Sequence, residues 1–168
     1  MHAYMTNGTL DFLLNLIDQH PEHHFYYMEN NKNVTVYYES EDKSVFESGR
    51  DYEIIAEEGT LKKQGYVVMN NIPVTEEGRP IFEDRFKKNK KRMEGVPGFS
   101  AFRLLRPDKG RTYVVLTQWS SETDFENWKT SDHFSAAHAD QGTKHPAYFA
   151  DRPFQTHYHM IDPDEVQD

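Results

Sequence analysis

Residues 64–74, QGYVVMNNIPV, limit the possible folds more than any other part of this sequence. β-branched and aromatic residues occupy both alternating faces of the segment, which is typical of a buried strand. A strand that is apolar on both faces needs cover on both sides. We therefore expect this strand to belong to a sheet that is enclosed between two layers.

The segments after this strand continue with alternating helix and strand patterns. A helix is predicted within residues 76–95, and strands are predicted at 100–106 and 111–119 on either side of a tight turn. The helix has an apolar stripe of four residues, Ile81, Phe82, Phe86 and Met93. The turn consists of Pro107, Asp108, Lys109 and Gly110, which are typical turn residues.

The C-terminal part predicts a further helix and a last strand. Ser121 begins a capping box in front of a helix with Phe125 and Trp128, and Ser131 can cap a second short helix with His138. Residues 154–161 alternate as a strand. The resulting order, β-α-β-β-α-β, is that of an α+β ferredoxin-like unit, whose helices cover one face of the sheet.

The N-terminal residues provide cover for the other face. The predicted elements there are strand 3–6, helix 10–20, strands 24–28, 34–38 and 44–48, and helix 52–57. We predict two parts, an α+β extension over residues 1–62 and a ferredoxin-like domain over 63–168. Their sheets are expected to pack face to face as a barrel-like pseudo-dimer within one chain. The extension would then replace a second subunit, so the chain is expected to be a monomer.

Charge and composition exclude several classes of function. The net charge is −9, and nucleic-acid binding needs a clustered basic surface. The one basic cluster, KKNKKR at 87–92, is interpreted as a solvated helix face. There is no cysteine, so disulfides and thiolate sites are excluded, and no run of about 18 apolar residues predicts a membrane span. We expect a cytoplasmic protein.

Three residues stand out as a possible ligand site. Trp128 and His138 would lie about 15 Å apart along one continuous helix, so a break near residues 130–132 is needed if they share a cavity. Asn70 is the polar residue on a strand face that is otherwise apolar, and an unpaired buried amide costs about 1–3 kcal/mol. A ligand would satisfy this amide, and a flat apolar ligand would suit a chain with ten Tyr, eleven Phe and two Trp.

Each of these residues also has a plain structural explanation. A histidine after two alanines is often a surface or core residue, a tryptophan is usually core, and an asparagine often pairs with a neighbouring turn. The histidines at 20, 23 and 24 lie in a turn without a spaced second pair, which makes a metal site there weak. His157 and His159 share one strand face without a carboxylate nearby, and His133 has no clear role.

Several motifs together resemble a known family. They are NNIPVTEEGRPIFEDRFKKN, Pro97-Gly98-Phe99, RLLRP at 103–107 and FENWKTSDHFSAAH at 125–138. The sequence resembles the IsdG-type haem-degrading monooxygenases of the antibiotic biosynthesis monooxygenase superfamily, and its N-terminal extension resembles that of the HmoB-type subgroup. The resemblance is best over residues 64–162.

This resemblance implies a role for each residue. His138 would be the proximal ligand of the haem iron, Asn70 would donate a hydrogen bond on the distal side, and Trp128 would press on the porphyrin. Arg85 matches a position near the haem propionates. The next basic position of the family falls on Asn89, which Lys88 or Lys90 could replace. Asn71 lies beside Asn70, and strand alternation allows only one of the two to face the site.

The resemblance also implies the chemistry. Haem would be both substrate and cofactor, O₂ would be the oxidant, and iron would be released after the ring opens. Electrons would come from a separate reductase or a small reductant, because no GxGxxG dinucleotide motif follows a strand. Two alternatives remain open. One is a non-enzymatic, TRAP-like stress or signalling protein, a group that can lack the asparagine and the tryptophan. The other is a cofactor-independent monooxygenase of the same superfamily that acts on an aromatic small molecule.

Overall fold

Eight strands close into one antiparallel barrel in the computed structural model, which describes residues 1–88, 93–131 and 149–166. The order around the barrel is β1-β3-β2-β8-β5-β7-β6-β4. The strands are β1 (His2–Gly8), β2 (Tyr26–Glu29), β3 (Val34–Ser40), β4 (Arg50–Gly59), β5 (Tyr66–Pro73), β6 (Phe99–Pro107), β7 (Thr112–Trp119) and β8 (Phe154–Ile161). The helices in the described ranges are α1 (Leu10–Gln19), α2 (Arg79–Lys88), α3 (Glu122–Lys129) and α5 (Pro163–Val166).

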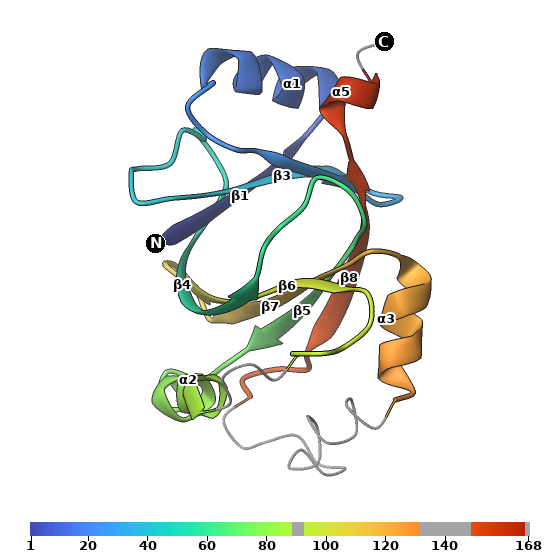
Figure 1. Cartoon of the computed structure of the whole chain (residues 1–168). Helices are drawn as coiled ribbons and strands as arrows, with labels where there is room; N and C mark the ends of the chain where they lie inside the picture. Colours follow the sequence, from blue (N-terminus) through green and yellow to red (C-terminus); the bar gives the residue numbers. More distant parts are fainter. Residues whose placement is uncertain (89–92, 132–148, 167–168) are drawn as a thin grey trace.

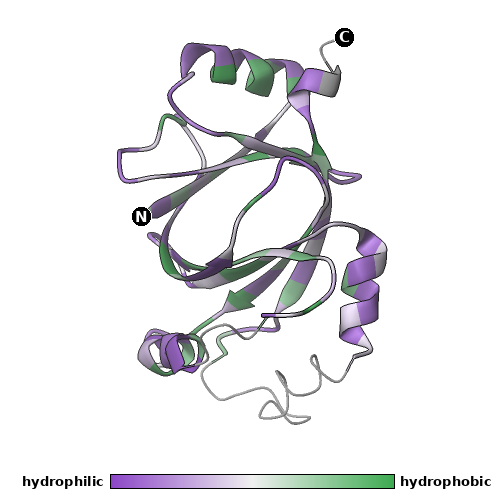
Figure 2. Cartoon of the chain, in the orientation of Figure 1, coloured by the Kyte–Doolittle hydropathy of each residue, from purple (hydrophilic) through white to green (hydrophobic). Residues whose placement is uncertain are grey.

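The helices lie on the outside of two opposite barrel walls. Figure 1 shows α1 against the wall that contains β1 and β3, and α2 and α3 against the wall that contains β5, β6, β7 and β8. Figure 2 shows both hydrophobic and hydrophilic positions on α1 and α3, as expected for helices that cover one face of a sheet. No helix in the described part of the chain is long and apolar enough to cross a membrane.

Apolar side chains from both walls fill the barrel interior. The inward residues of β5 and β7 include Val67, Met69 and Leu116, and they meet Met5, Tyr37 and other residues of the N-terminal strands in one buried cluster. The other faces of the same strands bury a second set of apolar residues under α2 and α3. This two-sided burial is the reason why residues 64–74 are apolar on both alternating faces.

The predicted β-α-β-β-α-β order is confirmed by β5, α2, β6, β7, α3 and β8. Ser121 caps α3 as predicted, since its side chain accepts a hydrogen bond from the backbone N–H of Asp124. The turn after Pro107 contains Gly110 at φ 85°, a conformation that glycine adopts without strain. The predicted sheet-to-sheet packing takes the form of one continuous barrel, in which β2 pairs with β8 and β4 pairs with β6.

Three predictions about the elements were wrong. Residues 52–57 are part of strand β4 and not a helix, because pairing with both β1 and β6 outweighs the helical propensity of Glu53, Ala56 and Glu57. Residues 44–48 form no strand, and the backbone N–H of Val45 instead donates to the Tyr38 hydroxyl at 2.8 Å. Within the described residues α2 ends at Lys88, and Ile81 is 58% exposed rather than part of the buried stripe. Met93 is buried, but in a turn.

Candidate functional site

The candidate site lies on the outer face of β5 and β7, between α2 and α3. Helix α2 packs over β7 through Phe82, whose ring centroid lies 4.9 Å from that of Tyr113. Helix α3 packs over the other end of β7 through Phe125, 5.8 Å from Trp119 between ring centroids. Figure 1 shows the two helices outside the barrel, at different ends of this wall.

Asn70 lies at the junction of the two helix-covered clusters. Its neighbours on the same strand face are Val68, which packs in the cluster with Trp128, and Ile72, which packs in the cluster with Phe86. The side-chain amide of Asn70 is partly buried, and it makes no hydrogen bond to any residue that the structure describes. An amide in apolar surroundings with free donor and acceptor capacity is suited to bind a polar group of a ligand.

Asn71 faces the other side of the strand and is fully engaged. Its Nδ2 donates to the carbonyl of Met69 at 3.2 Å, to the carbonyl of Phe154 at 3.2 Å and to Oγ1 of Thr156 at 3.3 Å. The bonds to Phe154 and Thr156 hold β5 to β8. Of the two adjacent asparagines, Asn70 is therefore the one whose side chain is available at the outer face.

Trp128 lies in the last turn of α3 at the edge of this face. Its ring centroid is 5.2 Å from that of Trp119, with an interplanar angle of 37°, and 6.2 Å from that of Phe125. The indole is partly buried, so one part of it packs on the sheet and another part faces outward. Helix α3 ends at Lys129, with Thr130 as its cap. A break near residues 130–132 was predicted, and the helix end agrees with it.

The remaining site predictions differ in how far the structure informs them. His138 and His133 lie outside the described residues, and so does the second short helix with Phe134. Arg85 is partly buried in the last turn of α2. Helix geometry separates Arg85 from Glu83 by about 200° around the axis, so Arg85 lies on the side of α2 opposite to the side that contacts β6.

The suggested substitutes for the second basic position are less suitable. Lys88 is exposed and its Nζ pairs with Oδ2 of Asp84 at 2.8 Å, and Asn89 and Lys90 lie outside the described residues. Hydrogen bonding to Asp84 raises the pKa of Lys88 above its ordinary value. Lys88 therefore has a local partner already.

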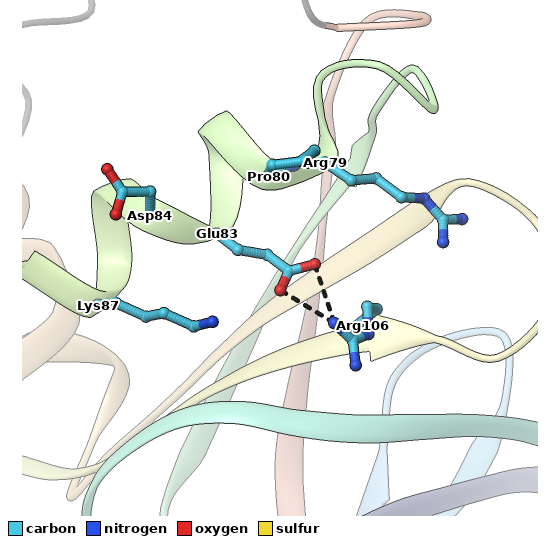
Figure 3. A pocket seen from close by; sticks show the side chains of 6 residues that line it. All are labelled: Arg79, Pro80, Glu83, Asp84, Lys87 and Arg106. Atoms are coloured by element: carbon cyan, nitrogen blue, oxygen red, sulfur yellow. Dashed lines mark hydrogen bonds and ion pairs between the residues drawn. The ribbon is translucent and has the colours of Figure 1, made fainter.

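A charged cluster on the other side of α2 was not predicted from the sequence. Glu83 is buried and accepts hydrogen bonds from Nη1 of Arg106, at 3.0 and 3.3 Å, and from the Tyr113 hydroxyl. Arg106 also donates to Glu53 at 2.5 Å. Figure 3 shows Glu83 and Arg106 pointing toward one another in a hollow of about 440 Å³, which Arg79 and Lys87 also line.

The chemistry of this cluster points to a structural role. Burial and the neighbouring Glu83 carboxylate raise the pKa of Tyr113, so the phenol stays protonated and donates. The positive and negative groups around the hollow largely compensate each other, which disfavours a charged ligand. The cluster fixes α2 on β6 and β7 and so positions Phe82 and Phe86 beside the candidate site. An arginine in an apolar strand and a glutamate next to Phe82 were the available sequence signals.

The other histidines do not form a metal site in the described ranges. His157 and His159 do share one strand face, where both rings contact Tyr66. His20 and His23 lie 3.4 and 3.6 Å from Glu22 in a turn. Within residues 1–88, 93–131 and 149–166, no group of three or more potential ligands could hold a metal ion.

Comparison with known proteins gives a family match over part of the chain. Residues 65–140, which contain β5, α2, β6, β7 and α3, match the antibiotic biosynthesis monooxygenase family. The match begins at β5 and includes Asn70, Arg85, Trp128 and His138, so all four candidate residues lie in this domain.

Similar proteins have two different names. The chain is 28% identical over 142 residues to the signal transduction protein TRAP of Staphylococcus aureus, covering 84% of this chain and 85% of that protein. It is 25% identical over 129 residues to a heme-degrading monooxygenase of Listeria monocytogenes, covering 77% of each. A solved structure of a major regulator of staphylococcal pathogenesis superposes with a TM-score of 0.85 at 25% identity, covering 96% of this chain and all of that one.

Proposed function

We propose that this protein binds haem on the outer face of β5 and β7 and degrades it. The observation that carries the proposal is the Asn70 amide, which lies between two aromatic clusters and has no hydrogen-bond partner in the described part of the chain. A flat apolar ring with a polar group over its centre matches this surface. The named heme-degrading relative, at 25% identity, supports the same choice of ligand.

The residues of the site fit haem in the following roles. His138 would ligate the iron through its imidazole, which is a common haem ligand. The Asn70 amide would donate to a polar group on the opposite side, and the Trp128 indole, backed by Trp119, would form a firm wall against the ring. Arg85 would pair with a propionate, since a guanidinium binds a carboxylate through two parallel hydrogen bonds.

Bound haem would supply the iron at which O₂ is activated. The protein's own contribution is to bind and orient the ring and to exclude water from it. The buried apolar side chains of Val68 and Ile72 flank Asn70 on the same strand face. An external reductase or small reductant would supply the electrons.

A second candidate function is that of a non-enzymatic, TRAP-like stress or signalling protein. Two observations favour it: the named TRAP relative is slightly more similar, at 28% identity, and the solved regulator superposes over nearly the whole chain. Neither observation concerns the residues of the site. The free amide of Asn70 favours ligand binding, and we therefore place haem degradation first.

Hemin titration followed by reduction tests this proposal. Wild-type protein should give a shifted Soret band that saturates, and the band should decay when ascorbate and air are supplied. His138→Ala should weaken the ligand spectrum, whereas Asn70→Ala and Trp128→Ala should bind hemin and degrade it slowly. His159→Ala is the matched control, because this exposed histidine lies on β8 and should leave both steps unchanged. No Soret shift in the wild type would favour the signalling protein.

Two further proposals concern the oligomeric state of the protein and its location in the cell. We propose that the N-terminal half takes the place of a second subunit, so that the chain works as a monomer with the division at residues 62 and 63. A cytoplasmic location remains a prediction from the cysteine-free sequence.

A further inference from the structure

Four side chains, beginning with Trp128 at the candidate site, form a series that ends at the surface of β8. Trp128 contacts Trp119, with 5.2 Å between ring centroids. Trp119 is fully buried and lies directly opposite Tyr66 in the β5–β7 pairing. The Tyr66 hydroxyl lies 2.6 Å from Nδ1 of His157, which is partly exposed. The side chains therefore form a continuous series from the site to the solvent.

Tyr66 and Trp119, the two middle residues of the series, lie close together. Directly opposite residues in an antiparallel pair have Cβ atoms about 4.5–5.5 Å apart, and the Tyr66 and Trp119 side chains point to the same face. The Phe125 ring contacts both of them, at 6.1 Å from Tyr66 and 5.8 Å from Trp119. Indole and phenol are the aromatic side chains that lose one electron most readily. Tyr66, Trp119 and Trp128 pack in one cluster, so an electron has only short distances to cross between them.

We propose that Tyr66, Trp119 and Trp128 form a relay that carries oxidising equivalents away from the haem site to His157 at the surface. The proposal rests on the proposed function, because the one-electron oxidant would form at bound haem from O₂ or peroxide. The relay would protect the haem site from oxidation, and it gives a function to residues that otherwise only pack in the core. Tyr66, Trp119 and His157 have no other role in that model.

The transfer is balanced in electrons and protons. The oxidant removes one electron from the Trp128 indole. One electron then passes from the Tyr66 phenol through Trp119 and restores Trp128, while the phenol proton moves to Nδ1 of His157. The products are a neutral Tyr66 phenoxyl radical and a protonated His157. A surface one-electron donor such as ascorbate, with one proton, returns Tyr66 to the phenol.

The hydrogen bond to His157 makes this last transfer possible. Burial raises the pKa of Tyr66, so the phenol is protonated before oxidation and must lose its proton when it loses the electron. A neutral imidazole with its proton on Nε2 accepts the Tyr66 hydrogen bond at Nδ1 and can take that proton. The carboxylates of Glu122 and Glu126 on α3 also raise the pKa of Tyr66, but the base hydrogen-bonded to its hydroxyl among the described residues is His157. His159 contacts the Tyr66 ring edge-on and lies in the exposed part of β8.

Pulse radiolysis of the haem-free protein tests the relay independently of haem. Azide radicals oxidise indole in preference to phenol, and this chain has two tryptophans, of which Trp119 is fully buried and Trp128 is partly exposed. Oxidation therefore begins at Trp128. We expect the indolyl absorbance to decay while the phenoxyl absorbance grows at the same first-order rate, independent of protein concentration.

Two variants and one control decide the result. Tyr66→Phe keeps the ring and loses the hydroxyl, and it should reduce the first-order phenoxyl growth at least tenfold. His157→Gln keeps an acceptor but not a base, and it should slow the growth severalfold and change its pH dependence. Tyr27→Phe is the control: Tyr27 is equally buried and its hydroxyl bonds to the carbonyl of Leu13, but it packs with the N-terminal cluster. It should behave as the wild type.

The outcomes separate the relay from the proposed function. Unchanged phenoxyl growth in Tyr66→Phe overturns the relay, even if the protein degrades hemin. Growth that depends on Tyr66 supports the relay, and if the same protein binds no hemin then the haem function alone is rejected. If Tyr27→Phe reduced the growth of the phenoxyl absorbance as much as Tyr66→Phe does, the relay would also be overturned. The oxidation would then not follow one defined path through Tyr66.

Discussion

Replacing each of the two adjacent asparagines by alanine should give opposite results. Asn70→Ala and Asn71→Ala are identical changes on neighbouring positions of β5, and the two side chains point to opposite faces of the strand. Asn71 donates to three acceptors, two of which are on β8, whereas Asn70 donates to none of the described residues. Stability should therefore depend on Asn71, and ligand binding on Asn70.

The magnitude follows from the hydrogen bonds that are lost. The Asn71 amide has two hydrogens, so at most two of its three bonds are well formed at any time. At about 0.5–1.5 kcal/mol for each bond, Asn71→Ala should lower the free energy of unfolding by about 2 kcal/mol. For a chain of this length that corresponds to a fall in Tm of roughly 4–8 °C. Asn70→Ala loses no such bond and should stay within about 0.5 kcal/mol of the wild type.

Urea unfolding and hemin titration measure the two effects separately. Unfolding followed by tryptophan fluorescence gives the free energy, and the Soret band gives binding and turnover of hemin. We expect Asn71→Ala to unfold at lower urea and, while folded, to process hemin as the wild type does. Asn70→Ala should unfold at the wild-type midpoint and degrade hemin slowly. Equal loss of stability in both variants would show that Asn70 is a packing residue, and the site would lose its main support.

Three further predictions concern stability and assembly. The hydrogen bond from Arg106 lowers the pKa of Glu53, so this pair stabilises the fold above the unfolded pKa of about 4.3 and stops doing so as the pH falls through the folded pKa. The difference in unfolding free energy between wild type and Glu53→Gln should therefore shrink between about pH 7 and pH 3; a constant difference would contradict this. Gly98→Ala should cost more than Gly95→Ala, although both have positive φ, because a Cβ at Gly98 collides with Asp124 and one at Gly95 meets open space. Both alanines carry the cost of about 1–2 kcal/mol for a left-handed backbone conformation. Equal urea midpoints for the two variants would therefore show that the collision with Asp124 does not matter. Light scattering should give a single species near 19.8 kDa, and one of twice that mass would refute the monomer.

Local patterns were sufficient to predict the C-terminal half of the fold. Strand β5 is apolar on both faces, and Ser121 carries a side chain that caps the next helix, so each element is encoded within a few residues. Strand β4 could not be predicted in the same way. Its helical-looking sequence becomes a strand because β1 and β6 offer partners on both sides, and neither partner is near in sequence.

Some features of the candidate site follow from local sequence patterns, and others depend on contacts between residues that are far apart in the sequence. Strand alternation alone separates Asn70 from Asn71, but only the pairing with β8 shows what holds the Asn71 amide. The bond between Glu83 and Arg106 joins residues 23 positions apart, and no spacing rule connects them. The same is true of Tyr66 and His157, which are 91 positions apart and meet because β5 pairs with β8.

The strand order predicts one haem per chain. The N-terminal strands follow the order β4-β1-β3-β2 and the C-terminal strands follow β8-β5-β7-β6, so the two halves repeat one arrangement. In the C-terminal half, α3 lies between β7 and β8 and brings Trp128 to the site. The corresponding segment between β3 and β4 has no helix, and its Phe46 ring packs 5.2 Å from that of Tyr38 on the outer face of β3.

That difference leaves the N-terminal face without one side of the site. Hemin titration should therefore saturate at one equivalent in the wild type, and Phe46→Ala should not add a second, because no counterpart of α3 would hold the ring. A second equivalent would point to the hollow of about 560 Å³ beside α1, which Phe12, Phe46 and His20 line. Such a result would mean that the missing helix is not needed, and the argument that α2 and α3 together define the site would fail.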